Sequence, residues 1–118
     1  MPSLRDLVIF IADDTIRIGE QIDPDDLPIS NLTTLREELG SLRVDARTDP
    51  TAAKIIRNLN RIQILATNDL MMGRARSPET QRWLQILRER ASDHVMSIIL
   101  HPDYKPPVSE PPPPPPKN

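Results

Sequence analysis

The chain of 118 residues has no cysteine, three glycines and three aromatic residues, and each shortage excludes a class of protein. Without cysteine there is no disulfide framework, no thiolate metal site and no cysteine nucleophile. Glycine occurs only at positions 19, 40 and 73, so a glycine-rich phosphate-binding loop is impossible. The aromatic residues are Phe10, Trp83 and Tyr104, which leaves few side chains on which nucleic-acid bases can stack.

Long apolar runs are also missing. The longest extends from Leu7 to Ala12 and has six residues, whereas a membrane-spanning helix needs about 20. Asp6 precedes this run, and Asp13 and Asp14 follow it, which is not the pattern of a secretory signal. We therefore expect a soluble, cytoplasmic protein, or one that lies within a viral assembly.

Proline, by contrast, is abundant, and nine of the 14 prolines fall in residues 101–118. This distribution predicts a helical domain over residues 1–101 and a proline-rich tail over residues 102–118. The run of six prolines at 111–116 favours an extended polyproline II helix. Pro112, Pro115 and Lys117 match the pattern that SH3-type grooves read. A spacer, or a linker to another part of the chain, explains the tail equally well.

The other prolines mark places where helices begin or cannot continue. Asp49-Pro50 and Ser77-Pro78 each combine a capping residue with a proline in the first helical turn. The polar stretch 23–28, which holds two prolines, is a connector. Between these marks apolar residues recur every three or four positions, which predicts helices over residues 31–43, 50–72 and 78–100.

Two of these helices carry long apolar stripes that we expect to form most of the core. The first stripe consists of Ala52, Ile55, Ile56, Leu59, Ile62 and Leu65. The second consists of Leu84, Leu87, Ala91, Val95 and Ile98, and it is widened by Trp83, Ile86, Met96 and Ile99. Both stripes are broader than a small bundle needs to bury, so exposed stretches of these helices are a candidate dimer seam.

The N-terminal segment permits two interpretations. Ser3 and Asp6 resemble a capping box, and the apolar spacing that follows favours a helix over residues 4–21. Branched residues before Asp13-Asp14 and an alternating pattern after them would also suit a pair of strands. With the helix, the sequence predicts an all-α fold, a small antiparallel four-helix bundle with an aliphatic core and an extended C-terminal tail.

Charge is distributed unevenly, with a balance of −6 over residues 1–53, +4 over residues 54–100 and −2 for the whole chain. The simple interpretation is that the acidic half packs beside the basic half. The alternative is a basic surface that attracts phosphate or an acidic protein. Its members would be Lys54, Arg57, Arg61, Arg74, Arg76, Arg82, Arg88 and Arg90.

Residues suited to catalysis or metal binding are few. His94 and His101 lack an evident third ligand for a metal ion. We expect His101 to interact with the last carbonyls of a helix, and His94 to lie at the surface or at the edge of the core.

The acidic residues of the connector, Asp23, Asp25 and Asp26, suggest calcium. However, Pro28 and Thr34 stand where the calcium loop needs glycine and glutamate. We expect these acids to keep the loop solvated and to complement the dipole of a helix start.

Taken together, the sequence favours a non-catalytic helical interaction or adaptor module that self-associates or is part of a larger assembly. Its proline-rich arm would act as a spacer or dock on a partner. We expect no cofactor, no metal, no membrane and no small-molecule substrate. Alternatives are a nucleic-acid-binding protein that uses the basic region 54–90, and a structural component of a virus particle. The candidate partner-binding residues are Trp83, Arg57, Arg61, Pro112, Pro115 and Lys117.

Overall fold

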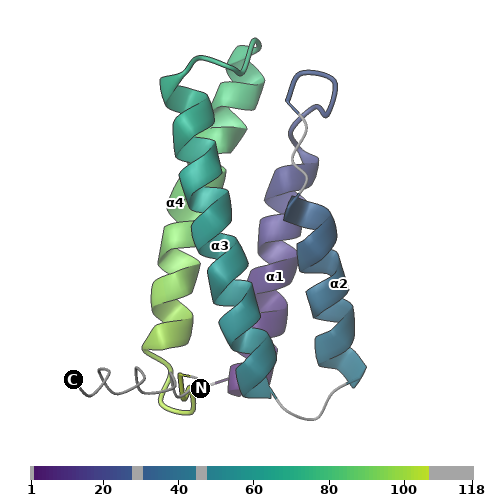
Figure 1. Cartoon of the computed structure of the whole chain (residues 1–118), viewed down its shortest axis with the longest axis vertical. Helices are drawn as coiled ribbons and strands as arrows, with labels where there is room; N and C mark the ends of the chain where they lie inside the picture. The colour runs from purple at the N-terminus through teal and green to yellow at the C-terminus, as the bar shows by residue number, and fades with distance from the viewer. Residues whose placement is uncertain (1, 28–30, 45–47, 107–118) are drawn as a thin grey trace, which may run out of the picture.

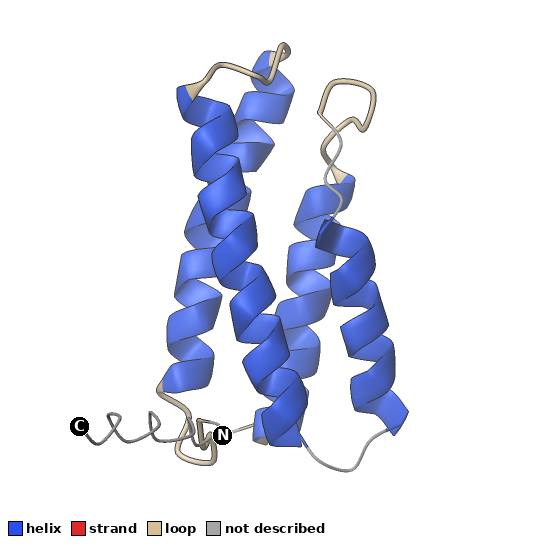
Figure 2. Cartoon of the chain, viewed as in Figure 1, coloured by secondary structure: helices blue, strands red, loops and turns tan. Residues whose placement is uncertain are grey.

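The computed structural model describes residues 2–27, 31–44 and 48–106, and all regular structure in these residues is helical (Figures 1 and 2). The helices are α1 (Leu4–Glu20), α2 (Asn31–Val44), α3 (Thr48–Met71) and α4 (Pro78–Ile99). The all-helical expectation is therefore confirmed. The strand pair considered for the N-terminal segment is wrong, because α1 runs unbroken through Asp13 and Asp14.

The ends of the helices follow from local hydrogen bonds. The Ser3 hydroxyl oxygen accepts a hydrogen bond from the Asp6 N–H, and the Ser77 hydroxyl oxygen accepts one from the Thr80 N–H. Gly73, with a φ of 61°, ends α3 in the left-handed conformation that glycine adopts at low cost. At the other end, α3 begins at Thr48, so Pro50 lies in the first turn as expected, but Asp49 is inside the helix and is not its cap.

Consecutive helices run in opposite directions and form an up-and-down bundle (Figure 1). Each helix packs against its neighbours in the order α1, α2, α3, α4 and back to α1, and the α3–α4 contact is the most extensive. Helices α1 and α3 also meet across the diagonal, whereas the described parts of α2 and α4 do not. Of the proline-rich tail predicted over residues 102–118, residues 107–118 lie outside the described residues, and their extended conformation stays a prediction.

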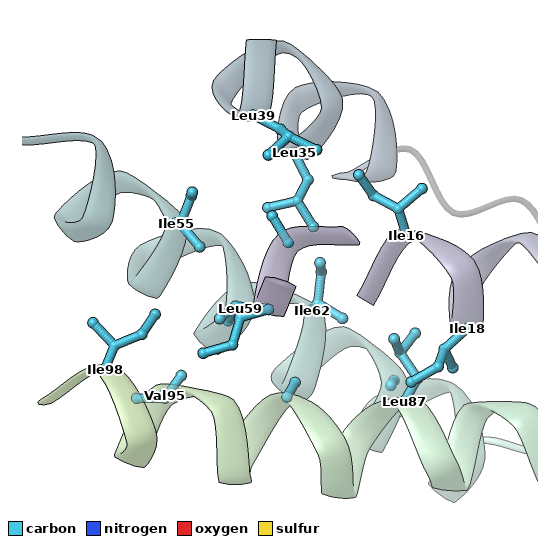
Figure 3. Packing of buried hydrophobic residues seen from close by; sticks show 14 of the residues in the cluster. Ile16, Ile18, Leu35, Leu39, Ile55, Leu59, Ile62, Leu87, Val95 and Ile98 are labelled. Carbon is cyan, nitrogen blue, oxygen red and sulfur yellow. The ribbon is translucent and has the colours of Figure 1, made fainter. Parts of the chain in front are cut away.

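The core is aliphatic, as expected, and draws on all four helices (Figure 3). Its most deeply buried members include Ile11, Leu35, Ile55, Leu59 and Ile98. Each such side chain stabilises the fold by about 1.5–3 kcal/mol relative to an exposed one. The second predicted stripe is confirmed from Leu84 to Ile98, but Met96 and Ile99 at its margins are exposed.

Gly19 allows α1 and α2 to approach closely. A Cβ atom at this position would overlap the buried side chain of Leu32, coming within 2.7 Å of its Cδ2. By contrast, a Cβ atom at Gly40, in the middle of α2, would meet nothing within 4 Å. The two glycines therefore differ in their packing although both lie inside helices.

We expect Gly19→Ala to be less stable than Gly40→Ala, because the buried Leu32 side chain must shift to make room for the new methyl group. Gly40→Ala is the matched control and should stabilise the fold by about 0.5–1 kcal/mol, because alanine is the better helix former. Urea unfolding followed by far-UV circular dichroism measures both effects. Equal stabilisation by the two substitutions would contradict the close approach of α1 and α2.

Candidate functional site

A groove between α2 and α3 brings together Arg57 and Arg61, two of the predicted partner-binding residues. Its volume is about 480 Å³. The residues that line it are Thr34, Glu37, Glu38, Ser41, Lys54, Arg57, Asn58 and Arg61. The α3 wall is therefore basic, whereas the α2 wall carries two carboxyl groups.

Glu38 is the residue of this groove whose carboxyl group is least favourably placed. Burial raises the pKa of its carboxyl group, and a hydrogen bond with Asn58 and the charges of Lys54 and Arg57 only partly oppose this. Its Oε2 atom is buried and has no hydrogen-bond partner among the described residues.

We expect Glu38→Gln to stabilise the protein at neutral pH. Because the pKa of Glu38 is higher in the folded than in the unfolded chain, its ionisation makes stability fall as pH rises from about 4.5. The substitution should remove this loss, whereas Glu37→Gln should reduce it only slightly, because the charge of Glu37 is the smallest of the causes that shift the pKa of Glu38. Thermal unfolding as a function of pH tests the pair, and a lower Tm for Glu38→Gln at neutral pH would contradict the expectation.

Two of the remaining basic residues, Arg74 and Arg90, form ion pairs away from this groove. The Arg74 guanidinium lies 3.1 Å from Asp69 Oδ1, within the turn that ends α3. Arg90 lies 3.3 Å from Asp14 Oδ2, on the side of the bundle where α4 packs against α1. The basic character of residues 54–90 is thus divided between different sides of the bundle.

Trp83 lies on α4 with its side chain half-buried and packed against the core. It also lines a surface groove of about 450 Å³, together with Pro78, Glu79, Arg82 and Ile86. Trp83 therefore lies at the margin of the core and is also accessible from a surface groove, while its role in binding a partner stays a prediction. Pro112, Pro115 and Lys117 lie outside the described residues, and their role stays a prediction.

His94 is buried, whereas we expected it at the surface or at the edge of the core. Its Nε2 atom lies 2.7 Å from Asp14 Oδ2, and its ring meets the Phe10 ring edge-on with centroids 6.2 Å apart. These contacts join α4 to α1. The sequence carries no local signal for this pair, because the two residues are 80 positions apart.

His101 is also buried, and its partners differ from the expected helix carbonyls. Its Nδ1 atom accepts a hydrogen bond from the Asp103 N–H, and its Nε2 atom lies 3.0 Å from the Pro2 carbonyl oxygen. Nε2 must therefore carry the proton and donate it to Pro2. The described residues contain no cluster of three or more potential metal ligands around either histidine or elsewhere.

Asp26, in the acidic connector, binds the start of α4. Its carboxylate oxygens accept hydrogen bonds from the N–H groups of Arg76 and Ser77, at 3.0 and 3.2 Å. The Thr80 hydroxyl, followed by these two N–H groups, lowers the pKa of Asp26 to about 2. The connector acid therefore complements a helix start as expected, but the helix is α4, far along the chain.

We expect Asp26→Asn to lower the Tm at neutral pH. The pKa of Asp26 is about 2 in the folded chain against an ordinary 3.8, so its contribution is complete above that ordinary value. The contribution is then lost as pH falls towards about 2. The Tm difference between the wild type and Asp26→Asn should close over this range, whereas Asp25→Asn should show no such pH dependence.

The second half of α3 carries an apolar surface that the periodicity did not reveal. Ile64, Leu65, Met71 and Met72 are exposed by 61, 43, 79 and 70 %. Leu65 was expected in the buried stripe, but α3 extends past the start of α2, which leaves this part of its flank uncovered (Figure 1). We call these four residues, the last of which directly follows the end of α3, the α3 apolar surface. Ile64, Met71 and Met72 do not belong to the predicted buried stripe of this helix. Their position outside the stripe was the one sign in the sequence of their exposure.

No protein-family model, curated protein or solved structure matches the chain. None of the described helices is long and apolar enough to cross a membrane.

Proposed function

We propose that the chain is a non-catalytic helical interaction module that binds a second copy of itself through the α3 apolar surface. The observation that carries this proposal is the high exposure of Ile64, Leu65, Met71 and Met72 at one end of a helix whose other apolar residues are largely buried. Several exposed apolar residues on one stretch of a helix are a common mark of protein interfaces.

The spacing of the surrounding residues suits a helix-to-helix seam. Arg61, Ile64, Asn68 and Met71 follow one another at intervals of three, four and three. This is the spacing of facing positions in a coiled coil, and a polar asparagine among them can specify register and oligomeric state. An identical α3 on a second copy offers the same apolar surface and an asparagine to pair with, so the interface is self-complementary.

The size of the surface predicts a weak association. Four side chains with these exposures present an apolar area on the order of 500 Å², near the upper limit for a monomer. A stable interface usually buries about 800 Å² on each partner. Polar residues around the surface must supply the remaining buried area. We expect the fraction of dimer to rise with protein concentration.

The groove between α2 and α3 supports a protein ligand over nucleic acid. Lys54, Arg57 and Arg61 are exposed on the α3 wall, and although the charges of Lys54 and Arg57 also act on Glu38, all three can contact an acidic ligand. However, Glu37 and Glu38 on the opposite wall would repel a phosphate backbone. A polypeptide with charges of both signs fits this groove better than a nucleic acid.

The proposal predicts that the wild type exceeds 13.4 kDa by light scattering at high concentration. Ile64→Lys combined with Met71→Lys should weaken the association by about tenfold or more, because the charges must be desolvated in the interface. Met96→Lys, an exposed methionine on α4, is the matched control and should leave it unchanged.

Far-UV circular dichroism checks that each variant is folded. A monomer at every concentration would contradict self-association. If Met96→Lys weakened the association as much as the α3 variant does, the result would contradict the placement of the interface on α3.

A further inference from the structure

The groove around Trp83 on α4 has the composition of a proline-recognition site. An aromatic ring between apolar walls holds a polyproline II segment, and an acidic group beside it selects a flanking basic residue. Here Trp83 supplies the ring, Pro78 and Ile86 supply apolar walls, and Glu79 supplies the acid. Glu79 is exposed and forms no ion pair with any described residue.

The same chain contains a matching ligand. Residues 111–116 are six consecutive prolines, and Lys117 follows them directly. The sequence predicts a polyproline II helix for this run, which is already stiff before it binds and so loses little conformational entropy. We propose that the proline run docks in the Trp83 groove of its own chain and places Lys117 beside Glu79. This proposal does not depend on self-association.

The distances allow the tail to reach the groove. The described chain continues for seven residues after α4, to Pro106, and Trp83 lies in the first turns of α4, towards the opposite end of that helix. From Ile98 back to Trp83 the helix rises by about 22 Å at 1.5 Å per residue. A polyproline II segment that starts at Pro106 covers about 22 Å by Pro113, in the middle of the run.

The register of the charged residues fits as well. Glu79 lies about 28 Å from Ile98 along the helix. Lys117 lies about 34 Å from Pro106 along an extended tail, and the lysine side chain is long enough to span the difference. In a tail that runs back along α4, the prolines therefore lie beside Trp83, and Lys117, which follows them, lies beside Glu79. The order of these residues in the tail matches the order of their partners along α4.

Trp83 is the only tryptophan of the chain, so its fluorescence reports directly on the groove. The experiment compares the full chain with a variant in which prolines 111–116 are all replaced by serine. Loss of docking should shift the emission to the red and raise the acrylamide quenching constant about twofold, because one face of the ring becomes open to water.

Charge exchange then tests the contact between Lys117 and Glu79. Lys117→Glu should shift the emission in the same direction, and the double variant Lys117→Glu, Glu79→Lys should restore it. Lys105→Glu reverses a lysine that precedes the proline run and serves as the matched control, with no expected change. Far-UV circular dichroism confirms that each variant is folded.

The result that would overturn the proposal is an unchanged Trp83 fluorescence after replacement of the prolines. Equal effects of Lys105→Glu and Lys117→Glu would also overturn it, because they would indicate a general charge effect. A change of the wild-type signal with protein concentration that persists in Ile64→Lys, Met71→Lys but disappears when the prolines are replaced would place the contact between copies and overturn docking within one chain. These outcomes are independent of the light-scattering result for the α3 apolar surface.

Discussion

The long antiparallel contact between α3 and α4 is the constraint on which the rest of the structure depends. These are the two longest helices, and their contact is the most extensive in the bundle. Because the chain has few aromatic residues, branched aliphatic side chains must fill the space between the helices. The shorter α2 then covers only part of α3, and the uncovered end becomes the α3 apolar surface.

The sequence predicted the features that depend on local pattern and missed those that depend on distant partners. Helical periodicity located the helices, and Ser77-Pro78 marked the start of α4 because capping involves neighbouring residues. The contacts of His94 with Asp14 and of Asp26 with Ser77 join residues 80 and 51 positions apart. Periodicity contains no information on such pairs, since it describes a single helix and not its neighbours.

Leu65 shows the same limit for the candidate site. Its spacing from Leu59 and Ile62 is that of a buried stripe, yet it is 43 % exposed. Burial requires both a suitable face and a neighbour of sufficient length, and only the face can be read from periodicity. Arg57 and Arg61 line the same groove because they lie one helical turn apart, which their spacing in the sequence indicates. The acidic wall opposite them depends on how α2 packs and therefore required the tertiary structure.

The turn at Gly73 places the two candidate binding regions at the same end of the bundle. Met71 and Met72 lie just before this turn, and the groove that includes Trp83 begins just after it at Pro78. Asp26 holds this end together, because its carboxylate binds the N–H groups that lead into α4. Both regions therefore rest on one framework, and a change that loosens this end of the bundle would weaken both. Variants on α4 must accordingly be compared at equal stability before a loss of binding is assigned to the surface itself.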